Sequence, residues 1–350
     1  MSAEYSLAQE LEAKGELQSA ATAYDRAYGL HPGNAEIAEA RRRLLDRLAV
    51  TEYGINFRYI PAGSFLMGST KGDPDEAPVH DVELAEYWLA ETPISWSTYC
   101  ELMNWEPPPK SAPREFEEVP PDQLPPVLFL HGENQIRLQY CEDETLRALD
   151  WHAHEPEDHP IKQYFGNPPR KDSASPWTYE RKPMVSVSWQ AAVELGDRIS
   201  NAEIVYRLPA EAEWEKAARG GLIDSVYPWG NDPPTRQRCD FDRMDELSIL
   251  PVREFAPNGY GLYAMSGCVW EWTGDWYDAG YYGESPDHDP VGPATGEQKV
   301  LRGGSWTDCA ETVTVSFRMS RMSNSWKERK WSQHNSPNIG FRLCRVRQVL

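Results

Sequence analysis

The first fifty residues place small and apolar side chains at the spacing of an α-helix. Positions three and four apart in a helix share one face, so this spacing predicts two buried helical stripes. Gly15 interrupts the first stripe, and the run His-Pro-Gly-Asn at 31–34 ends the second. We therefore predict two short helices before residue 31 and a third from about Ala35 to Ala49. The positions that carry the first two stripes are Ala8, Leu11, Ala20, Ala21, Tyr24 and Ala27.

The two predicted helices form a unit that is similar to one tetratricopeptide repeat. The positions that carry this similarity are Leu7, Ala8, Gly15, Ala20, Tyr24, Ala27 and Pro32. A lone repeat cannot bury its own apolar face, so these helices must pack against something else. That surface is either the rest of this chain or a partner protein, and the sequence leaves both open.

From residue 51 onward the pattern changes to short alternating stretches. Phe57–Met67 alternates apolar and polar residues around a Pro-Ala-Gly bend, which predicts one bent strand. Met184–Trp189 reads as a strand and Gln190–Ile199 as an amphipathic helix. A further helix is expected to open within Leu208–Glu215 and to end at Gly220. The remaining residues, to Arg345, predict short strands and turns.

The stretch 106–182 has no clear period and reads as an insertion. Its first part, 106–126, is dense in proline and acidic residues, which predicts an extended loop. Its second part carries His152, His154 and His159 among neighbouring carboxylates. Imidazole with carboxylate suits iron or zinc, so these histidines are candidate metal ligands. A polar surface loop is the reading of these histidines that we favour over a metal site.

Composition indicates a globular protein rich in loops and aromatic contacts. Of the 350 residues, 26% are charged and 40% are hydrophobic, which is typical of globular proteins and not of disordered chains. The chain has 14 tryptophans and 17 tyrosines beside 29 prolines and 24 glycines. Many aromatic side chains among many turn residues predict little long helix.

Charge and cysteine content exclude several classes of partner. The net charge of −20 argues against nucleic acid and against an anionic membrane surface. No stretch is long and apolar enough to span a membrane, and Met1–Gln18 lacks the features of a secretory signal. We therefore expect a cytoplasmic protein with free thiols. The cysteines, none in a C-x-x-C pair, are Cys100, Cys141, Cys239, Cys268, Cys309 and Cys344.

A series of motifs occurs in order over residues 55–345. Each motif alone is weak, but the ordered set resembles the sulfatase-modifying-factor, or formylglycine-generating-enzyme, family. The resemblance implies an α+β, loop-rich, C-type lectin-like domain over 51–350, preceded by the helical segment 1–50. The motifs are Pro61–Ser69, Ala77–His80, Val185–Trp189, Tyr206–Gly221, Tyr227–Asn231, Pro257–Tyr263, Val269–Thr273, Asp275–Tyr277, Leu301–Trp306 and Ile339–Arg342.

The family that this chain resembles includes copper-dependent cysteine oxidases, iron-dependent sulfoxide synthases and non-catalytic binding proteins. The oxidases hold copper through two thiolates near the C-terminus, because soft thiolates suit Cu(I). By family spacing these two positions fall here at Asp308 and Val313, and Cys309 is one place off. The cysteine pair is therefore absent, and we expect no redox metal and no catalysis.

The resemblance also implies a structural calcium site. Its oxygen ligands would be the carbonyl groups of Gly267 and Val269 and the side chain of Glu271. Two positions that usually carry polar side chains in this loop are Ala264 and Cys268 here. Calcium is thus the one cofactor that the resemblance suggests.

The segment 307–335, called here the C-terminal face, lies between two well-matched motifs and departs from the family pattern. Members diversified by retroelements resemble this arrangement, with a fixed scaffold on both sides of a variable ligand surface. Rigid aromatic and cationic side chains are typical of binding surfaces. The candidate ligand-binding residues are Thr307, Asp308, Cys309, Thr312, Thr314, Ser323, Trp326, Arg329, Trp331 and His334.

Our leading hypothesis is a non-catalytic protein that binds a protein or peptide ligand on the C-terminal face. The alternative is an iron- or copper-dependent oxidoreductase that uses the three histidines of the insertion with Cys309. A third reading is a scaffold subunit whose N-terminal helices contact a partner.

Overall fold

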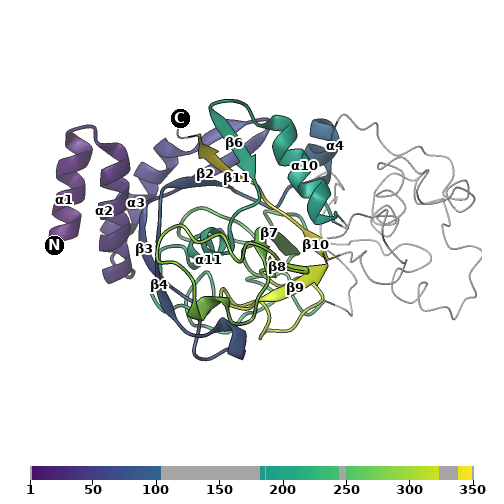
Figure 1. The fold of residues 1–350 in the computed structure, drawn as a ribbon. Helices are drawn as coiled ribbons and strands as arrows, with labels where there is room; N and C mark the ends of the chain where they lie inside the picture. Colours follow the sequence, from purple (N-terminus) through teal and green to yellow (C-terminus); the bar gives the residue numbers. More distant parts are fainter. Residues whose placement is uncertain (1, 104–181, 186, 244–249, 323–337, 349–350) are drawn as a thin grey trace, which may run out of the picture.

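The computed structural model describes residues 2–103, 182–185, 187–243, 250–322 and 338–348. Three helices come first, namely α1 (Ala3–Ala13), α2 (Leu17–Leu30) and α3 (Ala35–Leu48). They lie together on one side of a loop-rich body of short strands (Figure 1). The predicted helical segment is confirmed, and so is the loop-rich α+β class of the chain. The division into two domains at residue 50 stays a prediction.

Local signals explain where the N-terminal helices begin and end. Gly15 has φ +82° between α1 and α2, a left-handed conformation that glycine adopts without strain. The side chain of Asn34 accepts hydrogen bonds from the backbone N–H groups of Glu36 and Ile37, which caps the start of α3. Both breaks fall where the sequence predicted them.

The strands form two main sheets and a separate hairpin. The first sheet has the order β1 (Val50–Glu52), β2 (Ile55–Ile60), β5 (Tyr87–Ala90), β11 (Cys344–Arg347), β6 (Ile204–Arg207). The second has the order β10 (Ile339–Gly340), β7 (Trp270–Trp276), β8 (Gln298–Arg302), β9 (Met319–Met322). Only β10 and β7 pair in parallel among these described strands. The hairpin consists of β3 (Gly63–Met67) and β4 (His80–Leu84).

The remaining elements are short and support the sheets. α4 (Trp96–Met103) and α10 (Trp189–Ile199) lie near the first sheet, and α11 (Glu211–Arg219) lies near the second (Figure 1). In the described part of the chain, two short 3₁₀ helices, η1 (Pro74–Glu76) and η4 (Tyr281–Gly283), interrupt the loops. Gly220 ends α11 in a left-handed conformation with φ +62°, as the sequence predicted.

One apolar cluster runs from the N-terminal helices through both sheets. It includes Tyr24 and Leu44 from the helices, Phe57 from the first sheet and Trp270 from the second, all 1% exposed or less. The helices therefore bury their apolar stripes against the body of this same chain. Trp214 of α11 is also fully buried at the centre of this cluster.

A buried arginine fixes the helices to the body. Arg41 of α3 donates to Asp25 of α2 at 2.8 Å and to the carbonyl oxygen of Gly259 at 2.6 Å. Its guanidinium lies 4.5 Å from the ring centre of Tyr28 and 4.4 Å from that of Tyr260. Because Gly259 and Tyr260 belong to the body, this one side chain connects both parts.

Two predicted strands differ from the structure. Phe57–Met67 is not one bent strand, because its two halves fall into β2 and β3, which belong to different sheets. The described residues of Met184–Trp189 form no strand and instead lead into α10. Their backbone groups bond to separate partners, such as the carbonyl of Ile94 for Met184 and the Trp272 side chain for Val187. The predicted insertion, apart from residue 182, lies outside the described residues.

Candidate functional site on the C-terminal face

A turn that favours glycine directly precedes the C-terminal face. After β8, Gly303 and Gly304 adopt φ +100° and +69°. A Cβ atom on Gly304 would lie 2.7 Å from a methyl group of Val313 and 2.8 Å from the carbonyl oxygen of Thr312. The chain therefore folds back so closely that residues 312–313 lie against the turn.

Arg302 holds the return of this loop from inside the protein. Its guanidinium is fully buried and donates to the carbonyl oxygens of Val315 and Ser316, both at 2.7 Å. The same group pairs with Glu211, at 3.3 Å, and with Glu215 of α11. The backbone of the loop is thus fixed by a side chain that is not part of the exposed surface.

Arg318 fixes the other end of the loop. It donates to both carboxylate oxygens of Glu211, at 2.7 and 3.0 Å, and to the carbonyl oxygen of Asp75 at 2.8 Å. Glu211 thus receives two guanidinium groups, those of Arg302 and Arg318. Glu211 and Glu215 of α11 belong to the motif Tyr206–Gly221. They bind the two arginines that hold the loop in place.

The first candidate ligand-binding residues belong to a local polar cluster. The Ser305 hydroxyl hydrogen-bonds to the Asp308 carboxylate and lies 2.9 Å from the Thr307 hydroxyl. The Asn338 amide donates to both hydroxyls at 3.0 Å. Burial raises the pKa of Asp308, although the Ser305 hydrogen bond works in the opposite direction. One oxygen of the Asp308 carboxylate is therefore already hydrogen-bonded within its own loop.

The outer part of the described loop is polar and accessible. Cys309 is exposed, and Thr312 and Thr314 are half-buried. The Thr312 hydroxyl donates to the carbonyl oxygen of Cys309 at 2.9 Å, and the Thr314 hydroxyl accepts from the Phe317 N–H at 3.2 Å. The structure thus brings Thr307, Asp308, Cys309, Thr312 and Thr314 together on one loop.

Two aromatic residues beside this loop were not among the predicted site residues. The rings of Tyr227 and Trp229 stack at 5.2 Å with an angle of 3°. The Tyr227 hydroxyl donates to the carbonyl oxygen of Ala310 at 3.5 Å. Both residues belong to the motif Tyr227–Asn231, which in the sequence indicates the family but not a ligand contact. Tyr227 is buried, and the partly exposed Trp229 that stacks on it is a suitable contact for a ligand.

The two positions expected for the thiolates of the family have other roles here. Val313 is fully buried and packs with Tyr227, Cys239 and Phe241. Asp308 is held by Ser305 as described. The neighbouring Cys309 is exposed, and none of Cys239, Cys268, Cys309 and Cys344 is in a disulfide.

Several predicted site residues lie outside the described residues. These are Ser323, Trp326, Arg329, Trp331 and His334 of the C-terminal face, and His152, His154 and His159 of the insertion. Within the described part of the chain, no three His, Cys, Asp or Glu side chains come together as a metal site. The contacts of a candidate site are therefore known only for residues 307–322 of the C-terminal face.

The predicted calcium loop is held by protein groups. Arg342 donates to both oxygens of the fully buried Glu271 at 2.7 Å, and the Trp214 indole donates at 2.8 Å. The side chain of Glu271 as arranged therefore does not fit the role of a calcium ligand, because a dication would have to displace Arg342. Calcium binding through the carbonyls of Gly267 and Val269 stays a prediction.

Two residues of the predicted calcium loop have a backbone conformation that is more usual for polar residues. Ala264 and Cys268 adopt φ +53° and +69°. Asn and Asp tolerate this left-handed conformation better than other non-glycine residues do. The backbone thus has the form that the polar residues usual at these two positions would favour.

The two curled sheets, the long connections and the Gly-Gly turn define a C-type lectin-like scaffold. The chain belongs to the sulfatase-modifying-factor family, because the model of the Sulfatase-modifying factor enzyme 1-like domain matches residues 52–347. Thus the family expected from the ordered motifs is confirmed.

Two relatives show the range of names within this family. A formylglycine-generating enzyme from Streptomyces coelicolor is 40% identical over 174 residues, which are 46% of this chain and 52% of that protein. The chain therefore spans about half the length of this relative. The inactive C-alpha-formylglycine-generating enzyme 2 of Bos taurus is 29% identical over 83% of this chain and 88% of its own.

A solved structure shows the same fold. Variable protein 1 of Treponema denticola has a TM-score of 0.56 and 21% sequence identity, with 85% of this chain and 97% of that chain covered. At this identity the likeness establishes the fold alone. As for membranes, no helix in the described part of the chain has the length and apolar character to cross one.

Proposed function

We propose that this chain is a non-catalytic member of its family that binds a protein or peptide ligand on the C-terminal face. The main support is what occupies the two positions where the family has thiolates. Here they are Asp308, whose carboxylate is hydrogen-bonded to Ser305, and the fully buried Val313. A copper ion needs two thiolates in line, and Val313 offers a methyl group that faces the core.

The form of the loop supports binding at this surface. Its backbone is fixed from inside by Arg302 and Arg318, while Cys309 is exposed and Thr312 is half-buried near the stacked pair Tyr227 and Trp229. A pre-organised surface loses little conformational entropy on binding. The names of two similar proteins, one called inactive and one called a variable protein, are consistent with this proposal.

Catalysis is tested first, with a cysteine-containing peptide, Cu(I) and oxygen, and mass spectrometry to detect conversion of the cysteine to an aldehyde. No conversion above a copper-only control is expected. Turnover that is lost in Cys309→Ser would overturn the proposal and favour a thiolate-dependent enzyme.

Binding is tested by selecting displayed random peptides on the immobilised full chain. Selected peptides should lose at least tenfold in affinity with Trp229→Ala or Thr312→Arg. The double variant Trp326→Ala with Trp331→Ala tests the part of the C-terminal face that lies beyond the described residues. Val291→Arg is the matched control, since Val291 is 70% exposed and lies in another loop. Equal affinity in all variants would place the binding surface elsewhere.

The alternative of a metal-dependent oxidoreductase rests on one observation, the exposed thiol of Cys309 one residue from the expected position. Elemental analysis of untagged protein for iron, copper, zinc and calcium separates the two functions. Stoichiometric iron or copper would favour the oxidoreductase and the histidines of the insertion. Calcium without a redox metal would support the binding protein with a structural ion. Cytoplasmic localisation and the absence of nucleic-acid and membrane partners belong to the same proposal.

A further inference from the structure

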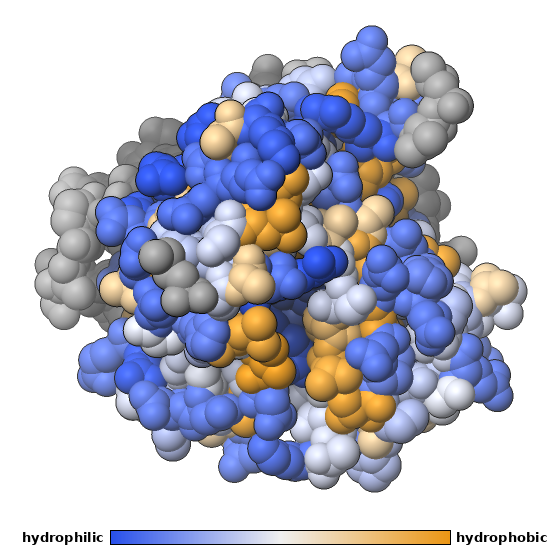
Figure 2. Space-filling model, turned by 90° about the vertical axis from the view of Figure 1, so that its left-hand side faces the viewer, coloured by the Kyte–Doolittle hydropathy of each residue, from blue (hydrophilic) through white to orange (hydrophobic). Residues whose placement is uncertain are grey.

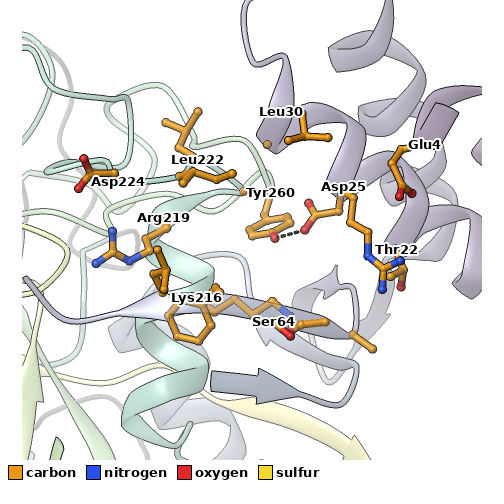
Figure 3. Close-up of a pocket in the computed structure, with 18 residues that line it drawn as sticks. Glu4, Thr22, Asp25, Leu30, Ser64, Lys216, Arg219, Leu222, Asp224 and Tyr260 are labelled. Atoms are coloured by element: carbon orange, nitrogen blue, oxygen red, sulfur yellow. Dashed lines mark hydrogen bonds between the residues drawn. The ribbon is translucent and has the colours of Figure 1, made fainter. Parts of the chain in front are cut away.

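A pocket lies between the N-terminal helices and the body, away from the residues that carry the proposed function. Its volume is about 340 Å³, at the small end of the range for ligand pockets. One wall comes from α2 with Thr22 and Asp25, and the facing walls come from β3 and from the loop after α11 (Figure 3). The pocket is therefore formed only when the helices are docked on the body.

The pocket combines an apolar rim with a polar interior. Leu30, Leu66 and Ile223 line it and remain 60%, 45% and 61% exposed. The face of the molecule on this side shows apolar areas on both sides of a hollow with hydrophilic atoms inside (Figure 2). Such an arrangement suits a small, mostly apolar molecule with one polar group.

Lys216 of α11 contributes the most unusual polar group. Its side chain reaches across the base of the pocket towards Ser64 (Figure 3), and the residue is 4% exposed. The Nζ atom donates to the carbonyl oxygens of Pro61 at 2.7 Å and Gly63 at 2.8 Å. No described carboxylate forms an ion pair with it.

The hydrogen-bond partners of Lys216 suit a neutral amine. A neutral amine has two N–H groups and one lone pair, whereas an ammonium group has three N–H donors. Two carbonyl oxygens satisfy the neutral form completely and leave the lone pair available, while the charged form would keep one donor without a protein acceptor. Burying an ammonium group without a counter-ion is also unfavourable.

The electrostatic environment agrees with this geometry. Burial lowers the pKa of Lys216 to about 8, although the more distant carboxylates of Asp25, Asp289 and Glu83 oppose the change. At pH 7.5 roughly a quarter of such an amine is neutral, compared with about 0.1% for an ordinary lysine. The neutral amine is the nucleophilic form.

We propose that Lys216 is a covalent acceptor site for small apolar aldehydes or ketones that enter this pocket. The Nζ lone pair attacks the carbonyl carbon and a C–N bond forms. The carbonyl oxygen then leaves as water, carrying both hydrogens of the amine, and an imine remains. The step is a condensation, so it needs neither an oxidant nor a reductant.

Lys299 provides a comparison within the same molecule. Burial lowers its pKa to about 8 as well. However, its Nζ lies 4.2 and 3.8 Å from the ring centres of Trp189 and Trp276 and donates to the Gly274 carbonyl at 2.7 Å. Lys299 is not a lining residue of the pocket. A comparison of the two lysines therefore shows whether a low pKa alone makes a lysine reactive, or whether the pocket is also needed.

The test exposes the full chain to benzaldehyde and sodium cyanoborohydride at pH 7.5, with peptide mass spectrometry to follow each lysine. Lys216 should be alkylated at least ten times faster than the exposed Lys71, and Lys299 should stay unmodified. Equal rates at Lys216 and Lys71 would overturn the proposal. Equal rates at Lys216 and Lys299 would also overturn it, because a low pKa alone would then be sufficient.

Two further samples test the role of the pocket. Ser64 is an exposed residue of β3 that lines the pocket, so Ser64→Trp should fill the entrance without disturbing the core. We expect this variant to slow alkylation of Lys216 at least fivefold and Val291→Trp, at an exposed position outside the pocket, to leave it unchanged. In urea the rates at Lys216, Lys71 and Lys299 should converge. Undiminished alkylation in Ser64→Trp would show that access does not run through this pocket.

Discussion

Arg342 and Glu271 form a two-point ion pair inside the protein, with both contacts at 2.7 Å and both side chains at most 1% exposed. Arg342 also donates to the carbonyl oxygens of Ala90 at 3.1 Å and Tyr263 at 2.9 Å. The pair thus connects β7, the end of β5 and the loop that was expected to hold calcium.

Removing one member of this pair should be strongly destabilising. Arg342→Met leaves the Glu271 carboxylate buried with only the Trp214 indole as donor, so we expect a loss of about 3–5 kcal/mol in the free energy of unfolding. Urea denaturation measures this loss. Arg238→Met is the control, because its pair with Asp232 is exposed and should contribute at most about 1 kcal/mol. Equal losses in the two variants would contradict the importance of the buried pair.

Arg41 should control how firmly the N-terminal helices are docked. Arg41→Met leaves Asp25 without its charged partner and frees the carbonyl of Gly259. We expect amide hydrogens of α2 to exchange at least tenfold faster, while those of β7 are unchanged. The neighbouring Arg42→Met is a matched control, since Arg42 is 69% exposed and lies 3.7 Å from Asp46. Uniformly faster exchange throughout the chain would indicate global destabilisation instead.

Asp240 should make the free energy of unfolding decrease as the pH rises from about 4 to about 6. Burial raises its pKa from 3.8 to about 6, despite Arg243 at 2.8 Å and the Leu250 N–H at 3.0 Å. The folded state therefore holds this proton more tightly than the unfolded chain does. Its contribution is fully present below pH 4 and is lost as the pH rises to about 6, by about 3 kcal/mol.

Urea denaturation at several pH values, compared with Asp240→Asn, isolates this contribution. The asparagine keeps an acceptor for the Leu250 N–H but does not titrate. The difference in free energy of unfolding between wild type and variant should fall between pH 4 and 6 and level off above. A flat difference over this range would show that Asp240 titrates near its ordinary pKa.

The cysteines should differ sharply in reactivity. Cys309 is exposed, whereas burial raises the pKa of Cys239 to about 12 and that of Cys344 well above its usual value. Iodoacetamide at pH 8 should label Cys309 within minutes and leave Cys239 and Cys344 unlabelled until urea is added. Peptide mass spectrometry identifies the sites. Labelling of Cys344 in the native protein would contradict its placement in the core.

Local signals in the sequence were sufficient for the helices but not for the sheet pairing. Gly15, Asn34 and Gly220 each impose a conformation on their own neighbours, so their positions could be predicted. The alternation of Phe57–Met67 reports only which side chains are buried, and β2 and β3 find their partners elsewhere in the chain. Pairing partners depend on contacts between distant residues, which a local pattern does not contain.

The same distinction applies to the candidate site. Family spacing located Asp308 and Val313, but it could not show that one is tied to Ser305 and the other lies in the core. Nor could it show that Lys216, on a helix whose residues are all buried, ends beside the carbonyl groups of Pro61 and of Gly63 at the start of β3. The Ser305 contact is local, whereas the contacts of Val313 and Lys216 arise where distant segments of the chain meet.

Because Arg302 holds the loop from inside the protein, the conformation of the loop does not depend on which side chains it exposes. Arg302 donates to backbone oxygens of Val315 and Ser316 and pairs with carboxylates of α11, none of which depends on the exposed side chains of the loop. An exchange at the exposed Cys309 therefore leaves this anchor in place, whereas an exchange at Thr312 or Thr314 loses one hydrogen bond to the loop backbone. The anchor of the loop is thus independent of its exposed surface, so new exposed side chains need no redesign of the core.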